Sequence, residues 1–169
     1  MYSLNVPLPS DVSARASTLA RELGTARPRA RGEHTLVVKR LGADDRTAFQ
    51  RQATRVREAL AGAPAFAAAV VDVDYFADPV TGSGPVVYLT VDSPGLHRIH
   101  TRLCDALAPV EGIEGEDYTP HVTIARGGSI EAARSLSTRE IEPIEWDVSE
   151  LHFWDAARAT SAGSVSLPA

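Results

Sequence analysis

The sequence contains only one cysteine, Cys104, among its 169 residues. A lone thiol cannot form an intramolecular disulfide, which excludes a disulfide-stapled scaffold and favours a reducing compartment. No apolar run approaches the roughly 20 residues of a membrane-spanning helix. Residues 1–10 also lack the basic start and the long apolar stretch of a secretory signal. We therefore expect a cytoplasmic protein with no membrane partner.

The sequence also has no excess of basic charge, because 17 Lys and Arg stand against 22 Asp and Glu, for a net charge of −5. This balance argues against broad electrostatic clamping of duplex nucleic acid. The positive charge is concentrated in residues 26–40, where five basic side chains stand against one acid, a net +4 that leaves −9 on the remainder. This segment is either a local anion-binding surface or a solvated loop with scattered arginines. Its basic residues are Arg27, Arg29, Arg31, Lys39 and Arg40.

The composition is close to the globular average, with 44% hydrophobic and 23% charged residues. Neither disorder nor a fibrous repeat is indicated. The length allows one domain with a good core, or two small lobes that share one. We expect residues 1–169 to fold alone as a single domain and to be a monomer.

Strands and helices alternate along the chain. Strands are indicated by β-branched runs and by alternating apolar residues, and helices by apolar faces that start after Ser or Asp and stop at Gly. Ser10 or Asp11 is expected to cap the first helix, and Ser93 with Pro94 to open the third. The predicted strands cover 2–6, 34–42, 66–76, 86–92, 121–126 and 144–154, and the predicted helices cover 11–23, 44–60, 93–107 and 129–136. The tail at 164–167 is either a last strand or disordered.

The two halves of the chain, roughly 1–80 and 84–169, repeat one order of strand, helix, strand, helix and strand. Each half has a histidine at the start of its second strand. His34 follows Tyr2 by 32 residues, and His121 follows Val86 by 35. Pseudo-twofold packing of the halves would bring both histidines to one cleft.

A strand-end histidine is, by itself, most simply explained as a half-buried residue with a hydrogen-bonded neighbour. Two histidines at equivalent places make that explanation a coincidence. Two imidazoles that face each other across a phosphodiester form an acid–base set without a metal, because their ordinary pKa of about 6.5 lets one accept a proton while the other donates one. Thr123 shares the strand face of His121, so its hydroxyl can donate to a phosphate oxygen.

Four segments, "YSLNVPLP", "HTLVVKRLG", "GPVVYLTVDSPGLHRIHTRL" and "YTPHVTIAR", together resemble the two-histidine (2H) phosphoesterase superfamily. That superfamily includes 2'-5' RNA ligase-like proteins and RNA 2',3'-cyclic phosphodiesterases, and it is marked by two His-x-Thr/Ser motifs on duplicated lobes. The resemblance implies a bilobal α+β fold, with two antiparallel sheets flanking a central cleft and the helices outside. It also implies a metal-independent phosphodiesterase without a cofactor, whose substrates are RNA ends or small nucleotides that carry a 2',3'-cyclic phosphate.

The second motif matches the superfamily pattern closely. The resemblance makes His121 catalytic and Thr123 a phosphate contact. Arg126 occupies the place of an arginine that often follows this motif, although strict alternation along a strand would turn its side chain away from His121. Lys39 is expected to contact phosphate or to steer the RNA backbone.

The first motif departs from the pattern His-x-Thr-Leu, because His34 is followed at once by Thr35 and then by Leu36. Either a catalytic His34 has lost its threonine partner, or a bulge at the strand start turns His34 and Thr35 into the cleft. Aligning on Thr-Leu instead would put Glu33 where the histidine belongs. We expect a catalytic His34 with Thr35 at the phosphate. The alternative is a catalytically weakened relative that binds RNA or a nucleotide without turning it over.

A metal-dependent hydrolase is a third hypothesis. His97, His100 and Cys104 fall three and seven residues apart on the predicted third helix, near one face. Zinc usually takes four protein ligands, or three and a water, and no close-spaced second pair of ligands is present. We therefore expect no metal site.

Overall fold

The structure is a computed structural model that describes residues 1–30 and 32–168. Its helices are α1 (Ser10–Ala20), α2 (Arg46–Ala59), α3 (Pro94–Ala106) and α4 (Ile130–Ser137), with short 3-10 turns η1 (Arg21–Leu23) and η2 (Gly115–Asp117). Its strands are β1 (Tyr2–Val6), β2 (Arg27–Pro28), β3 (Leu36–Arg40), β4 (Phe66–Phe76), β5 (Val86–Asp92), β6 (His121–Arg126), β7 (Ile144–Val148), β8 (Glu150–Asp155) and β9 (Thr160–Ser166).

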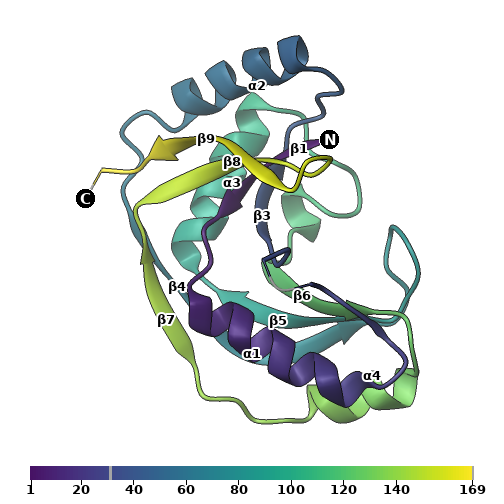
Figure 1. The fold of residues 1–169 in the computed structure, drawn as a ribbon. Helices are drawn as coiled ribbons and strands as arrows, with labels where there is room; N and C mark the ends of the chain where they lie inside the picture. The colour runs from purple at the N-terminus through teal and green to yellow at the C-terminus, as the bar shows by residue number, and fades with distance from the viewer. Residues whose placement is uncertain (31, 169) are drawn as a thin grey trace.

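The described strands form one curled antiparallel sheet in the order β7-β4-β5-β6-β3-β1-β8-β9, with β2 paired to β6 (Figure 1). In its middle, β3 and β6 pair only at Leu36 and Val122, whereas the other neighbouring strands pair over several residues. The sheet therefore divides into two antiparallel halves. This division confirms the predicted α+β architecture of two sheets with helices outside.

Each half of the sheet takes strands from both halves of the chain. Strand β4 pairs with β5 and β7, while β8 pairs with β1. The two lobes are thus interleaved along the sequence, and they do not coincide with the expected segments 1–80 and 84–169. The chain therefore crosses between the lobes more than once, because β1 and β3 lie in one half of the sheet, β4 to β7 in the other, and β8 and β9 in the first half again.

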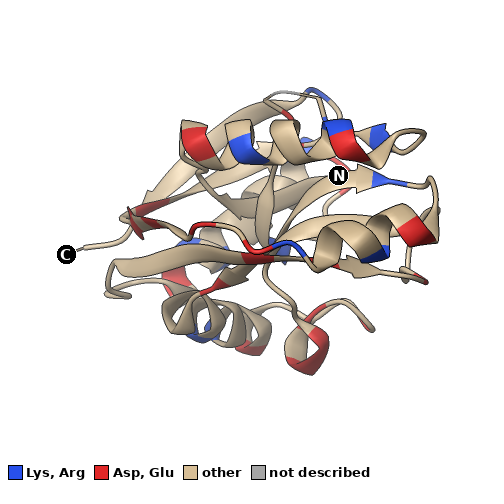
Figure 2. Ribbon diagram, turned by 90° about the horizontal axis from the view of Figure 1, so that it is seen from below, with Lys and Arg blue, Asp and Glu red and all other residues tan. Residues whose placement is uncertain are grey.

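Helices cover the outer faces of the two sheet halves. Helix α1 contacts β6 and α4 contacts β4, while α3 contacts β3 and β4 and carries α2 on its other side. Figure 2 shows the strands between these helices, with acidic and basic residues interspersed along the ribbon. Within the described residues, every helix is too short or too polar to cross a membrane.

Helix boundaries follow the local sequence signals at most places. The Ser93 hydroxyl accepts a hydrogen bond from the Leu96 N–H at the start of α3, as expected, and the Asp45 carboxylate caps α2 through the Ala48 N–H. The expected N-cap of α1 at Ser10 or Asp11 is wrong, because Pro9 is the N-cap, and the Asp11 carboxylate accepts from the Val12 N–H within the first turn instead.

The predicted strand over 144–154 is two strands. Strand β7 pairs with β4 at one edge of the sheet, and β8 pairs with β1 in the other half. The break falls at Ser149, whose carbonyl accepts a hydrogen bond from the Leu167 N–H. A one-residue break leaves the alternation of apolar residues nearly intact, so the pattern alone could not reveal it. Strand β9 confirms a last strand in the tail.

Candidate functional site

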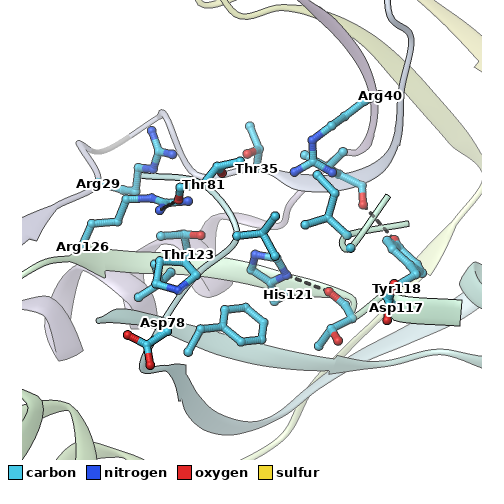
Figure 3. Close-up of a pocket in the computed structure, with 18 residues that line it drawn as sticks. Arg29, Thr35, Arg40, Asp78, Thr81, Asp117, Tyr118, His121, Thr123 and Arg126 are labelled. Carbon is cyan, nitrogen blue, oxygen red and sulfur yellow. Dashed lines mark hydrogen bonds between the residues drawn. The ribbon is translucent and has the colours of Figure 1, made fainter. Parts of the chain in front are cut away.

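A cavity of about 250 Å³ opens where the two halves of the sheet meet. One wall carries three side chains of β6, His121, Thr123 and Arg126, which lie opposite residues of β3 (Figure 3). A second wall comes from residues 76–81 and 112–119. The cavity therefore draws on both lobes, as a central cleft does.

A β-bulge in β6 brings Arg126 into this pocket. Tyr88 of β5 pairs with Thr123, and Val87 pairs with Ala125, so Ile124 is an extra residue without a partner. An extra residue shifts the alternation of all side chains after it. Arg126 consequently shares the face of His121 and Thr123, whereas strict alternation predicted the opposite face.

Strand β3 contains a β-bulge of the same kind. Leu4 of β1 pairs with Lys39, and Asn5 pairs with Val37, so Val38 is the extra residue. Burial follows one order in both strands, because the side chains from Leu36 to Arg40 and from Val122 to Arg126 are in turn buried, half-buried, buried, buried and half-buried. The residues of this segment that line the pocket are Thr35, Val37 and Arg40.

The matching bulges define which positions of the two lobes are equivalent. Thr35 takes the place that His121 has in the other lobe, Val37 takes the place of Thr123, and Arg40 takes the place of Arg126. The pocket therefore has an arginine from each lobe, but a histidine from one lobe only.

His34 does not reach the pocket with His121. Its side chain alternates to the other face of the chain from Thr35, is 8% exposed, and has no hydrogen-bond partner at either ring nitrogen among the described residues. Burial lowers the pKa of His34, and Arg29 lowers it further. A bulge at the strand start was one of the two explanations for the first motif, but the bulge of β3 lies at Val38 and therefore cannot turn the residues before it.

His121 is held in a defined orientation. Its Nδ1 lies 2.7 Å from the Thr119 carbonyl oxygen, which can only accept, so Nδ1 carries the proton and Nε2 is the free nitrogen. The rings of Phe76 and Tyr88 pack against the imidazole at centroid distances of 5.5 and 5.1 Å. Burial lowers the pKa of His121, as do Arg40 and Arg126, whereas the bond to Thr119 raises it. At neutral pH, Nε2 is therefore mainly an acceptor of a proton or a hydrogen bond.

Positive charge gathers on the pocket wall. Arg29, Arg40 and Arg126 all line it (Figure 3). Burial lowers the pKa of Arg126, and the two other guanidinium groups act in the same direction. A bound anion would relieve this mutual repulsion, so the wall favours a negatively charged ligand.

Arg29 is positioned at the pocket by the short strand β2, which the sequence did not predict. Strand β2 is two residues long and pairs with the end of β6, and the Arg29 N–H then donates to the Ile124 carbonyl at 2.9 Å. Only the local excess of positive charge at 26–40 pointed to this residue. Arg27 is exposed in β2, and Arg31 lies outside the described residues.

A family model for the 2'-5' RNA ligase superfamily matches residues 9–160. The chain belongs to this superfamily. Its fold resembles that of E. coli LigT in a complex with 3'-AMP, at 16% identity and a TM-score of 0.71 over 99% of this chain and 98% of that one. It also resembles TT0787 of Thermus thermophilus, at 19% identity and a TM-score of 0.67 over 98% and 97%. No curated protein matches the sequence.

This member of the 2'-5' RNA ligase superfamily departs from the two-motif pattern more than its sequence indicated. The structure puts Thr35 and Val37, rather than His34 or Glu33, at the positions equivalent to His121 and Thr123. Glu33 is exposed and does not line the pocket. The sequence "HTL" resembles the motif but lies before the bulge at Val38. The equivalence of Thr35 with His121 follows from that bulge, so the sequence alone did not reveal it.

Lys39 has a structural position, and the expectation that it contacts phosphate is wrong. The bulge at Val38 turns its side chain inward, where it is 1% exposed. Its Nζ donates to Glu114 at 2.6 Å and to the carbonyls of Ala108 and Arg40. All of its donors are thereby engaged, and Arg40 provides the positive charge at the pocket instead.

Tyr118 and His100 brace the wall of the pocket. The Tyr118 hydroxyl donates to the Val37 carbonyl at 2.8 Å, and its ring stacks on His100 at 3.7 Å between centroids. His100 Nδ1 lies 2.7 Å from the Val38 carbonyl, and its Nε2 accepts from the Gly115 N–H. These contacts give His100 a structural role, and the described residues contain no cluster of three or more metal-ligating side chains, at Cys104 or elsewhere.

Sulfate binding is expected to tighten as the pH falls, because protonated His121 adds a charge to the arginines. The free-state pKa of His121 lies below the ordinary 6.5, and a bound dianion raises it. Affinity should therefore increase as the pH falls from above the bound-state pKa to below the free-state pKa, by at most about tenfold per pH unit. Calorimetric titration with sulfate, which does not itself titrate in this range, measures the effect. The His121→Gln variant should show a flat profile, and a flat profile for the unmodified chain would contradict the assignment.

Proposed function

We propose that the pocket binds the phosphate of an RNA end or a small nucleotide, including one with a 2',3'-cyclic phosphate, and holds it with little or no turnover. The observation that carries this proposal is that two equivalent segments, one at β6 and one at β3, present different side chains to the pocket. Strand β6 offers His121 and Thr123 to the pocket, whereas the matching positions at β3 are Thr35 and Val37. Groups that bind an anion are present on both sides, but a group that transfers a proton comes from one.

The polar side chains of the pocket suit a phosphoryl group. The hydroxyls of Thr35 and Thr123 can donate to its oxygens, and guanidinium groups bind phosphate through paired hydrogen bonds. His121 Nε2 faces the same space. E. coli LigT, which has this fold, has been solved with 3'-AMP and with phosphate, and this supports a nucleotide as the ligand here.

Efficient hydrolysis of a cyclic phosphate needs two proton transfers, one from the attacking water and one to the departing ribose oxygen. Each positioned acid or base contributes about 10²–10⁴-fold to such a rate. His121 can serve one of these steps. A threonine hydroxyl in place of the second imidazole does not exchange protons near neutral pH, so the paired mechanism of the superfamily is incomplete.

A metal-independent phosphodiesterase that pairs His34 with His121, similar to 2'-5' RNA ligase-like hydrolases, is the second candidate. One observation favours it. Both ring nitrogens of His34 are buried and have no hydrogen-bond partner in the part of the chain that the structure describes, and an unsatisfied buried polar group costs about 1–3 kcal/mol. A turn of the segment before β3 that brought His34 to the pocket would remove this cost and would complete the acid–base pair.

One assay separates the two candidates. The purified chain is incubated with a nucleoside 2',3'-cyclic phosphate and with an oligonucleotide that ends in one, each with and without EDTA. The His34→Ala and His121→Ala variants are compared with His152→Ala, which alters a histidine of β8 away from the pocket. We expect saturable binding, and turnover that is slow or absent and unchanged in His34→Ala.

Other outcomes decide against the proposal. Rapid turnover that survives EDTA and is lost in both His34→Ala and His121→Ala would establish the paired-histidine phosphodiesterase. EDTA-sensitive turnover that survives both changes would indicate a metal-dependent enzyme. A chain that binds neither ligand would overturn both candidates.

A further inference from the structure

The pocket has two walls of different chemistry. One wall carries the arginines and threonines that suit a phosphate. The other comes from residues 76–81 and 112–117 and contains apolar side chains together with the carboxylates of Asp78 and Asp117. Apolar groups do not solvate an anion and carboxylates repel it, so this second wall must face another part of the ligand.

Val80 is an exposed apolar residue of the second wall. It is 64% exposed, although it lines the pocket. A Cβ placed on Gly112 would lie 3.6 Å from both Val80 methyl groups, so the two segments meet at this point. Arg126 Nη1 donates to the Thr81 carbonyl at 3.0 Å, which fixes the same segment to the anion-binding wall. Ile113 lies half-buried beside Gly112.

The cavity is larger than a phosphate requires. Its volume of about 250 Å³ is many times the ~10–15 Å³ that holds a single water. A phosphate group has one phosphorus and four oxygens, so most of a nucleoside can share the space. Tyr118 is fixed in the pocket wall, because one face of its ring is stacked on His100 and its hydroxyl is bonded to Val37.

We propose that Val80 and Ile113 form a subsite for the nucleobase of the ligand whose phosphate lies against His121 and Arg126. This inference rests on the proposed function. The apolar side chains cover the faces of a planar base, and the burial of Val80 on binding supplies affinity. The carboxylate of Asp78 or of Asp117 can accept a hydrogen bond from the amino group of adenine, guanine or cytosine and so orient the base.

The test compares a ligand that has a base with one that has none. Sulfate and adenosine 3'-monophosphate are titrated into the unmodified chain, Val80→Ser and Ile113→Ser. Val71→Ser, which changes an exposed valine of β4 outside the pocket, is the matched control. Val80→Ser should weaken adenosine 3'-monophosphate by about tenfold and leave sulfate unchanged. Because Val80 is exposed, this change does not threaten folding, and circular dichroism verifies the structure of the Ile113→Ser variant.

The subsite and the proposed function fail in different ways. If the unmodified chain binds sulfate but gains nothing from the adenosine, or if Val80→Ser leaves the nucleotide affinity unchanged, the subsite is overturned while the anion site stands. If Val80→Ser weakens sulfate and nucleotide equally, Val80 acts on the anion wall and the subsite is again overturned. If neither ligand binds, the proposed function itself fails.

Discussion

Replacement of Thr35 by histidine together with Val37 by threonine is expected to raise the rate of 2',3'-cyclic phosphate hydrolysis by about 10²–10⁴-fold. These two positions are equivalent to His121 and Thr123 by the bulges and by the order of burial in β3 and β6. Both side chains already line the pocket. The double change therefore places a second imidazole and a second threonine in the cleft without altering the core.

The restored pair would work as a complete acid–base set. His121 is held neutral at neutral pH by its burial and by the arginines, so its Nε2 can take the proton of the attacking water. The introduced imidazole must then be the protonated partner, and it gives its proton to the departing ribose oxygen. The phosphorus–oxygen bond to the ribose breaks as the bond to water forms, which leaves a phosphomonoester and a hydroxyl.

Two further variants make this expectation specific. Adding His121→Ala to the double change should remove the gain, because one imidazole is again missing. Glu33→His instead completes a His-x-Thr-Leu sequence in the alignment on Thr-Leu, and it should produce no gain because Glu33 lies outside the pocket. Steady-state rates with a nucleoside 2',3'-cyclic phosphate measure all of these. Activation by Glu33→His, and not by the double change, would refute the register assigned from the bulges.

The sequence predicted the elements of the fold well because their signals are local. The Ser93–Pro94 start of α3 and the alternation of β1 depend on neighbouring residues alone. The pairing of distant strands has no such local signal. Hence the interleaved lobes, the break at Ser149 and the two-residue strand β2 were not predicted.

The residues of the candidate site also divide into those that local alternation predicts and those that depend on strand pairing. His121 and Thr123 line the pocket as the strand alternation predicts. Arg126 and Lys39 follow the bulges at Ile124 and Val38, which exchange the faces that alternation assigns: Arg126 enters the pocket and Lys39 leaves it. A bulge is visible only from the register of two paired strands, so a single sequence could not place these residues.

Replacement of Glu114 by glutamine is expected to lower the free energy of unfolding by about 3–5 kcal/mol. Glu114 and Lys39 form an ion pair at 2.6 Å in which both side chains are 1% exposed. The Glu114 carboxylate also accepts from the backbone N–H groups of Arg40 at 2.7 Å and Val110 at 2.9 Å. Glutamine would leave the Lys39 charge buried without its counter-ion, and it would turn an amide N–H toward one of these donors.

Equilibrium unfolding in urea measures this loss, and Glu22→Gln is the matched control. Glu22 pairs with Arg139 at the surface, where 38% of the glutamate and 49% of the arginine side chain are exposed, so its replacement should cost no more than about 1 kcal/mol. Adding Lys39→Met to Glu114→Gln should recover much of the stability, because the unpaired charge is removed. Equal losses in the two glutamine variants would show that burial does not strengthen the Lys39 pair.

The dependence of this loss on pH tests its electrostatic origin. Burial acts to raise the pKa of Glu114, but the hydrogen bonds from Lys39, Arg40 and Val110 lower it overall from its ordinary 4.5. A carboxyl whose pKa is lower in the folded state contributes its full stability above the unfolded-state pKa and loses it as the pH falls through the folded-state pKa. The difference between the unmodified chain and Glu114→Gln should therefore be constant near neutral pH and should shrink below about pH 4.5. A difference that stayed constant in acid would instead assign the loss to packing, because the packing of Glu114 does not depend on its charge.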